Sequence, residues 1–431
     1  MTEVLIIAYH FPPAGGGGVQ RMSKFVRYLP DFDIRPIVLA GPGIGRGRWE
    51  PTDPSLSDDV PEDVAVYRPE DPPPAGFGDS RLHRILGTAG AFPRWWQHAV
   101  LHLGTTIARE HHPRVILVTA PPYHSIGSAI RLAERLGLPV VVDLRDPWAL
   151  DEGRFYPSGL HRRKALGEMR RLLTAADAVV MNCPEAGATV RSLVTDQTKI
   201  DVLPNGFDAA DFATLTRRPT RRLQVVHTGY LHSAAGLEHR RRQRRRLVLG
   251  AQIIPIDLLG RSHFYLLESL RLLAARNPGL TDRVEIILAG VLSDMDKRLV
   301  ELAGLDMPVL MPGYVDHRQA IQCMIDATVL FLPLHGLPDG HRARIVPGKT
   351  YEYLASGTPI LAALPNGDAR DLIVETAAGI PVEPADVDAM AAALEKLLME
   401  AVPRRPVNDL SPGYERRELT GRLAEILHNQ I

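Results

Sequence analysis

The chain has 431 residues, of which 45% are hydrophobic and 23% charged, as in an ordinary globular protein. At roughly 150 residues per domain, this length predicts two or three domains. Fifty basic and fifty acidic residues give a formal net charge of zero. No global field therefore favours nucleic acid or anionic lipid, and any such preference has to be local.

The two cysteines, Cys183 and Cys323, lie in apolar stretches of the sequence. We interpret both as small core residues of a protein kept in a reducing compartment. Neither has the spacing of a metal site, and the sixteen histidines form no HExxH pattern. The first strand begins without a basic leader, and no apolar run approaches the ~18–20 residues that a bilayer requires. We expect a cytoplasmic protein, and peripheral contact with the inner face of the membrane stays open.

Short runs rich in valine, isoleucine and leucine alternate with helical patterns from end to end, which is typical of parallel strands covered on both faces. The predicted strands are residues 4–9, 36–40, 64–67, 115–119, 140–143, 178–181, 202–203, 225–227, 284–289, 309–311, 329–332, 360–363 and 380–382. The predicted helices include residues 19–29, 125–136, 161–175, 264–275, 385–398 and 414–428. This alternation indicates α/β units.

So many strands exceed one open sheet, which rarely has more than about 10. We therefore predict two doubly wound, Rossmann-like domains that face a central cleft. A polar stretch with proline and clustered arginine at residues 212–222 predicts the linker. The predicted N-terminal domain is residues 1–212 and the C-terminal domain residues 222–400. The tail, residues 401–431, is expected to place its helix back on the first domain.

Four successive glycines follow the first strand, within residues 10–21. At a strand-to-helix junction, glycines let the backbone approach a ligand closely. The G-x-G-x-x-G fingerprint fails because its third glycine would fall on Gln20 or Arg21, and the second strand ends without a ribose-binding acid. A nicotinamide oxidoreductase is disfavoured. We favour ligand contact over a simple tight turn.

Two further strand ends carry polar groups. His124 precedes a helix, and Arg145 and Asp146 follow the next strand. Groups at the carboxyl ends of adjacent parallel strands can reach one ligand. His124 could serve as a hydrogen-bond donor or a base, and Asp146 as an acceptor for a hydroxyl. Taken singly, each is more often a capping or loop residue.

Residues 347–359 read as a Pro-Gly turn, a short helix and a Gly-Thr-Pro stop, followed by an apolar strand. Lys349 and Glu352 share one face of this helix, with Tyr353 and Ser356 beside them. In a bound nucleotide diphosphate, the phosphates could contact Lys349 and the N-terminus of the helix, and the ribose hydroxyls could donate to the Glu352 carboxylate. The alternative is an i,i+3 surface ion pair worth about 0.2–0.5 kcal/mol.

Three segments are less easily interpreted. Residues 41–57 form a loop rich in proline and glycine with Arg46, Arg48 and Trp49. Residues 81–102 carry aromatic and arginine side chains that suit either a lipid-linked acceptor or core packing. The segment 236–260 contains the basic run 239–246, for which a solvated helix face is favoured over contact with acidic lipid, nucleic acid or another polyanion.

Taken together, these elements resemble the retaining GT-B glycosyltransferases, which take a sugar from a nucleotide donor. The likeness covers nearly the whole chain. It is closest to a bacterial branch with an HFPP…GG…R start, an RDPW segment and a PGKxYEYLxxGxPIL segment. The matching stretches are residues 10–21, 145–148, 202–208, 226–231, 312–315 and 347–361. Each is weak alone, but their common order across two domains is a strong signal.

The resemblance implies that the C-terminal domain holds the donor nucleotide and the N-terminal domain mainly the acceptor. Glu352 would hold the ribose and Lys349 the diphosphate. The implied catalytic residues are His124 and Asp146, near the transferred sugar or the acceptor hydroxyl. The implied donor- or substrate-binding residues are Gly17, Gly18, Arg21, Arg145, Asn205, Gly229, Arg261, Lys349, Thr350 and Glu352.

The implied reaction transfers a hexose with retention, from a UDP, GDP or dTDP sugar to an acceptor hydroxyl. Its setting would be the biosynthesis of cell-surface polysaccharide, glycolipid or secondary metabolites. No obligatory metal and no specific nucleic-acid partner are expected. Asp294 and Asp296 form a D-x-D pair, but they follow a strand end and open a helix, so we interpret them as loop or cap residues.

Two departures from the family pattern keep other functions open. Many relatives carry a second glutamate seven residues before the ribose-binding one, where this chain has Ile345. Asp339 and Arg342 are candidates for its replacement. The segment 236–260 stands where the family has a short glycine- and arginine-bearing loop, whose role Arg261 would recover. The alternatives are a nucleotide-sugar 2-epimerase, which needs further carboxylates, and a catalytically silent binding module.

Overall fold

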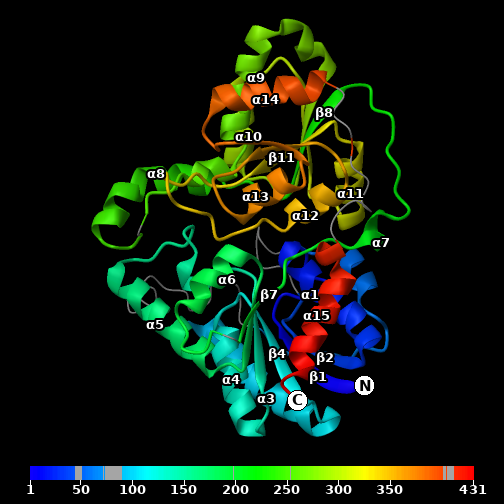
Figure 1. Ribbon diagram of the computed structural model, residues 1–431, viewed down its shortest axis with the longest axis vertical. Coiled ribbons are helices and arrows are strands. Elements are labelled where there is room, and N and C mark those ends of the chain that lie inside the picture. The colour runs from blue at the N-terminus through cyan, green and yellow to red at the C-terminus, as the bar shows by residue number, and fades with distance from the viewer. Residues whose placement is uncertain are drawn as a thin grey trace. The chain divides into compact units, whose positions relative to one another are not determined.

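The computed structural model describes residues 1–43, 51–70, 72, 90–197, 199–252, 254–400, 404 and 412–431. Arg46, Arg48 and Trp49, residues 81–89 and most of residues 401–411 lie outside this part. The chain forms two compact units, each with its own parallel sheet (Figure 1). The first unit is Met1–Gly206, Leu249–Ala251 and Gly413–Ile431, and the second is Phe207–Val248 and Gln252–Pro412.

The sheet of the first unit has the order β3-β2-β1-β4-β5-β6-β7 among the described residues. Its strands are β1 (Thr2–Ala8), β2 (Ile34–Ala40), β3 (Val66–Tyr67), β4 (Val115–Ala120), β5 (Val140–Leu144), β6 (Ala178–Met181) and β7 (Ile200–Val202). All neighbouring pairs are parallel. Beyond its first two residues β1 is wholly buried, as expected for a strand covered on both faces.

The helices of the first unit include one from the C-terminus of the chain. They are α1 (Gly17–Tyr28), α3 (Ala91–His111), α4 (His124–Leu136), α5 (Gly159–Ala175), α6 (Pro184–Arg191) and α15 (Arg416–His428). Leu419, Leu423 and Leu427 of α15 lie in the same core as β1 and α1. The expected return of the last helix to the first domain is thus confirmed.

The second unit repeats the arrangement with the order β10-β9-β8-β11-β12-β13. Its strands are β8 (Leu223–Thr228), β9 (Val284–Ala289), β10 (Val309–Gly313), β11 (Val329–Pro333), β12 (Ile360–Ala363) and β13 (Gly379–Val382). Its helices are α7 (Ala209–Phe212), α8 (Ser233–Val248), α9 (Phe264–Arg276), α10 (Asp294–Ala303), α11 (His317–Asp326), α12 (Lys349–Ala355), α13 (Asp368–Glu375) and α14 (Val387–Met399). The topology is that of a doubly wound Rossmann-like domain.

The prediction of two such domains is confirmed, and every predicted strand is present within a few residues. Asp296 completes a capping box with Ser293 at the start of α10, as a cap residue should. In α3, Trp96 is buried and its Nε1 donates to Ser125 Oγ at 2.8 Å, so this tryptophan is a core residue. In the described ranges, no helix is both long enough and apolar enough to cross a bilayer.

Both sheets have a topological switch point, where the strand order reverses. It lies between β1 and β4 in the first unit and between β8 and β11 in the second. Ligands of open α/β sheets bind outside the carboxyl ends of the strands at such points. The polar segments that follow β1, β4 and β8 are therefore the candidate ligand-binding segments.

The packing of α15 generates a stability prediction. Leu423→Ala removes a buried side chain from the core of the first unit and should lower its free energy of unfolding by about 2–5 kcal/mol. All four tryptophans precede residue 207, so denaturation followed by tryptophan fluorescence reports on this unit. The exposed Glu425→Ala on the same helix is the control and should change stability by less than ~0.5 kcal/mol. Equal effects of the two variants would contradict the assignment of α15 to this core.

Candidate functional site

In the second unit, helix α12 is joined to the carboxyl end of β8 at the switch point. The backbone amide of Thr228 donates to the Tyr353 hydroxyl at 2.9 Å, and Thr228 Oγ1 lies 3.3 Å from the same oxygen. Tyr353 is completely buried, so this bond is shielded from water. The two contacts fix the position of α12 relative to the strand.

Lys349, the first residue of α12, turns its ammonium group back to the same strand end. Its Nζ donates to the Thr228 carbonyl and lies 3.3 Å from His227 Nε2. His227 Nδ1 is 3.0 Å from the carbonyl oxygen of Phe331, so Nδ1 carries the proton and Nε2 accepts from Lys349. Gly229 has φ of 105°, and a Cβ there would lie 2.8 Å from Lys349 Nζ. Glycine is therefore needed at 229.

The environment of Lys349 lowers its pKa to about 7. Burial is the main cause, and the positive charge of Arg261 adds to it, whereas the Glu352 carboxylate acts in the opposite direction. Arg261 ends the short 3₁₀ helix Leu258–Arg261 that follows the basic segment. The positive charges of Arg261 and Lys349 are thus close enough to repel each other. An anion bound between these cations would be stabilised, and it would restore the full charge of Lys349.

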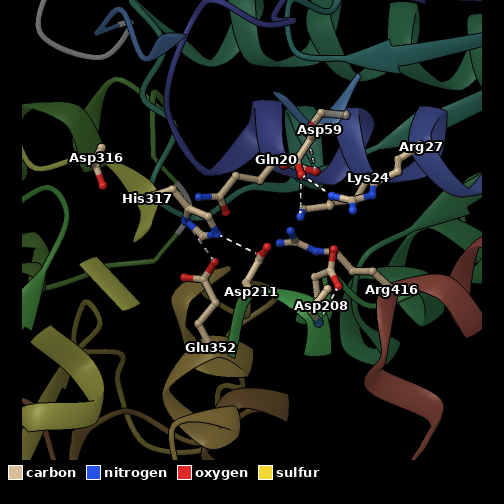
Figure 2. A network of polar contacts seen from close by, with 12 residues as sticks. Gln20, Lys24, Arg27, Asp59, Asp208, Asp211, Asp316, His317, Glu352 and Arg416 are labelled. Carbon is tan, nitrogen blue, oxygen red and sulfur yellow. Dashed lines mark hydrogen bonds and ion pairs between the residues drawn. The ribbon is translucent and has the colours of Figure 1, made fainter. Parts of the chain in front are cut away.

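Glu352 offers a buried acceptor. Glu352 as a whole residue is 7% exposed, and its Oε1 has no hydrogen-bond partner in the part of the chain that the structure describes. Figure 2 shows His317 between Glu352 and Asp211: His317 Nδ1 is 4.0 Å from Glu352 Oε1, and Nε2 is 3.0 Å from Asp211 Oδ2. A buried carboxylate oxygen that accepts no hydrogen bond is costly, so this geometry favours a ligand that brings a hydroxyl or amide donor.

Thr350 adds a second unsatisfied group to the same helix. Its Oγ1 is buried and makes no hydrogen bond with any described residue. The expected donor-side residues Lys349, Thr350, Glu352, Gly229 and Arg261 thus belong to one neighbourhood, at the carboxyl end of β8 and the start of α12.

The position of the absent family glutamate is apolar. Ile345 is buried. Of the two candidates for its replacement, Arg342 already pairs with Asp371 at 2.5 Å, and Asp339 is exposed. Neither arrangement reproduces a buried carboxylate at residue 345.

In the first unit, the glycine loop is shaped around Arg145. A Cβ on Gly18 would lie 1.6 Å from Arg145 Nη1, so any larger residue at 18 would force this guanidinium to move. Arg145 Nη2 donates to the Pro121 carbonyl at 2.6 Å, and Asn182 Nδ2 donates to the Arg145 carbonyl. Gly17 begins α1. The loop after β1 and the turn after β5 therefore meet at Arg145.

Arg21 is placed differently from the role that the resemblance implies. Its side chain is 1% exposed, and it donates from Nη2 to Asp143 Oδ1 at 2.9 Å and from Nη1 to the Pro204 carbonyl at 2.6 Å. The guanidinium thus joins α1 to β5 and to the chain after β7. It acts within the fold, and Asn205 next to Pro204 is likewise tied to α15, because its carbonyl accepts from Arg416 Nε at 3.3 Å.

His124 and Asp146 flank the same region of the first unit. His124 begins α4, and its Nε2 is buried and has no hydrogen bond within the described residues. Burial lowers the pKa of His124 to about 4, so the ring is neutral at pH 7. The pKa of His10 is also lowered, to about 3, by burial and by the charge of Arg145. Asp146 directly follows Arg145 and offsets part of the effect of burial on the Arg145 pKa.

Sequence reasoning missed His227, His317, Asp211 and Asn182. The signals were weak: His317 follows the residue 312–315 turn, and Asp211 follows the residue 202–208 motif. Each residue becomes a candidate only through a contact with a residue far away in sequence. Figure 2 also shows a structural cluster in the first unit, in which Lys24 and Arg27 both bind Asp59, at 2.8 and 2.7 Å.

Comparisons with known proteins agree with this geometry. Residues 16–206 match the family described as "Glycosyl transferase 4-like domain", and residues 260–400 match "Glycosyl transferases group 1". The two matches follow one another and together cover most of the chain. No curated protein sequence matches the chain at a significant level.

Solved structures with the same fold span the full chain. HepE from Anabaena, solved with UDP and glucose, has a TM-score of 0.62 at 14% identity, with 100% of both chains covered. Sucrose-phosphate synthase from Thermosynechococcus elongatus has a TM-score of 0.65 at 14% identity, covering 100% of this chain and 99% of that one. UDP-GlcNAc 2-epimerase from Neisseria meningitidis, bound to UDP-GlcNAc, has a TM-score of 0.57 at 11% identity, with 100% of both covered.

At these identities the structural neighbours establish the fold, and the two family matches establish the class of enzyme. The chain is a GT-B glycosyltransferase with two Rossmann-like, parallel-sheet domains.

Proposed function

We propose that this enzyme transfers a hexose from a nucleotide-diphosphate sugar to an acceptor hydroxyl with retention of configuration. The observation that carries the proposal is Glu352 Oε1, which is buried and accepts no hydrogen bond from a described residue, one helical turn from the half-buried cation Lys349. A nucleotide diphosphate brings both complements, because its ribose has hydroxyl donors and its diphosphate is an anion. The second unit is then the donor domain.

In this proposal the two cations act on the leaving group. Negative charge accumulates on the diphosphate as the glycosidic bond breaks, and Lys349 and Arg261 stabilise it there. Fixed charges in a water-poor site are worth more than in bulk water. Lys349 needs no movement for this, because His227 and the Thr228 carbonyl already hold its ammonium group. These cations can meet the charge of the diphosphate without an obligatory metal.

The acceptor side is proposed for the first unit. The neutral His124 ring has a buried Nε2 that can exchange a hydrogen bond with an acceptor hydroxyl, and Asp146 can accept one. Retention is inferred from the family resemblance. The same resemblance suggests the biosynthesis of cell-surface polysaccharide, glycolipid or secondary metabolites. A lipopolysaccharide galactosyltransferase, WaaB, shares the fold at 12% identity and a TM-score of 0.58.

The nucleotide itself can be identified by thermal shift. UDP is the first choice because HepE was solved with UDP, with UDP-glucose, and with UDP and glucose. One of UDP, GDP, dTDP and ADP should raise Tm most, with about 2.7 kcal/mol of stabilisation at 100 times its Kd. If none of the four shifts Tm, the silent-module alternative replaces the transferase proposal.

The role of Glu352 can be tested with a pair of ligands. Wild-type enzyme should bind the preferred nucleotide about 10–100-fold more tightly than its 2′,3′-dideoxy form, because hydrogen bonds to a charged group are lost. Glu352→Ala should bind both forms with equal, weakened affinity, as measured by calorimetry. Glu375→Ala, at an exposed position of α13, is the matched control and should keep the discrimination. Discrimination that survives Glu352→Ala would show that another residue holds the ribose.

The lowered pKa of Lys349 predicts a pH dependence of donor binding. Below pH 7 the ammonium is charged in the free enzyme, so the affinity for a nucleotide sugar should be flat. Above pH 7 binding must take up a proton, and the affinity should fall by at most about tenfold per pH unit. Lys349→Arg keeps its charge and should remove this dependence. A nucleotide sugar is the right probe because its diphosphate does not titrate near neutral pH.

The epimerase alternative is separated by product analysis. A transferase incubated with nucleotide sugar alone should leave the sugar configuration unchanged, whereas a 2-epimerase would interconvert two nucleotide sugars without any acceptor. Detection of such interconversion would move the assignment to the epimerases, which share the fold.

A further inference from the structure

The basic segment forms helix α8, whose inner face is firmly seated on the second unit. A Cβ on Gly236 would lie 2.6 Å from Leu259 Cα, so the helix packs closely on the 3₁₀ helix Leu258–Arg261. His239 Nε2 is 3.0 Å from Gln252 Oε1, and Gln243 Nε2 donates to the Ile256 carbonyl at 2.7 Å. Figure 1 shows α8 extending sideways from the sheet of this unit. The orientation of α8 on the second unit is therefore well defined.

Five of the six arginines of α8 fall into two groups. Arg240 pairs with Asp257 at 2.9 Å, and Arg242 pairs with Glu238 at 3.0 Å. Arg241, Arg244 and Arg245 are exposed and have no hydrogen-bond or ion-pair partner anywhere in the described part of the chain. No described residue therefore compensates their charges.

The three unpaired arginines share one face of the helix. At 3.6 residues per turn, positions 241, 244, 245 and 248 are i, i+3, i+4 and i+7 and project together. The fourth position is Val248, which is 87% exposed. We call Arg241, Arg244, Arg245 and Val248 the arginine face. Like charges at these spacings disfavour a helix, so the arginine face has no benefit to the fold that would explain it.

Apolar exposure continues at the end of α8. Leu249, the next residue along the chain, is 46% exposed. Exposed apolar side chains such as Val248 and Leu249 would contribute nothing to the binding of a soluble polyanion. Inserted among lipid chains beside anionic headgroups, they would be buried while the arginines bind phosphate.

We propose that the arginine face of α8 is a membrane-docking surface that binds anionic phospholipid headgroups and inserts Val248. Charge complementarity carries the proposal, and the exposed valine selects a lipid surface over nucleic acid or another soluble polyanion. Because the net charge of the chain is zero, the attraction is local to this face. The surface is separate from the proposed donor site and does not depend on the transfer reaction.

The test measures binding of the purified full chain to vesicles by flotation. Vesicles of phosphatidylcholine mixed with phosphatidylglycerol should bind the protein, with less binding as salt is raised, and vesicles of phosphatidylcholine alone should not. The triple variant R241Q/R244Q/R245Q should lower the partition coefficient on the order of 100-fold, since each basic residue at an anionic surface contributes roughly fivefold. Val248→Asn should lower it by up to about tenfold.

The matched control is R217Q/R221Q/R283Q, which removes three exposed arginines elsewhere on the second unit that have no partner among the described residues. It should bind anionic vesicles like the wild type. Unchanged melting temperatures and unchanged nucleotide binding show that loss of docking is not loss of folding. Three results would overturn the proposal: no binding to anionic vesicles, an equal loss in the control, or binding of the arginine face to heparin or RNA without binding to vesicles.

Discussion

The attachment of α12 to the end of β8 is the interaction on which the donor-side geometry depends. The buried Tyr353 hydroxyl accepts from the Thr228 amide, and Lys349 Nζ donates to the Thr228 carbonyl. One strand residue thus positions both ends of the segment that carries the cation and the carboxylate. With this framework the positive charge is half-buried and the acceptor oxygen is buried. The low pKa of Lys349 is a consequence of it, and so is the Glu352 oxygen that accepts no hydrogen bond from a described residue.

The first unit uses buried arginines in a different way. Arg21 and Arg145 donate to carbonyl groups and, for Arg21, to the Asp143 carboxylate, so their guanidinium groups hold loops together at the carboxyl ends of the strands. The glycine loop follows from the same constraint, since Gly18 leaves room for Arg145. The glycine run, which predicts ligand contact in the sequence, therefore also makes room for the packing of the Arg145 side chain. The acceptor residues proposed for this unit, His124 and Asp146, stand next to this arginine framework.

Charge in this protein is organised locally, although it cancels overall. Half-buried cations lie where the donor diphosphate is proposed, paired arginines support the fold, and the arginines of α8 that have no partner among the described residues face outwards. Arg240 and Arg241 are adjacent in sequence, yet one is bound to Asp257 and the other is not. The two side chains leave α8 in different directions, and only Arg240 points to the side on which α8 packs against the 3₁₀ helix Leu258–Arg261 and Asp257.

The sequence by itself determined the two-sheet α/β architecture, because the period and composition of buried parallel strands are local properties that survive without knowledge of their partners. It also placed Lys349 and Glu352 on one helical face, since i,i+3 spacing is a property of the helix. The tertiary structure alone decided which polar groups are free. The pairing of Arg21 with Asp143 and of His317 with Asp211 joins residues more than a hundred positions apart, and no local pattern encodes such contacts. Whether an arginine binds the fold or a ligand depends on those distant partners, and so only the folded chain separates Arg21 from Arg261.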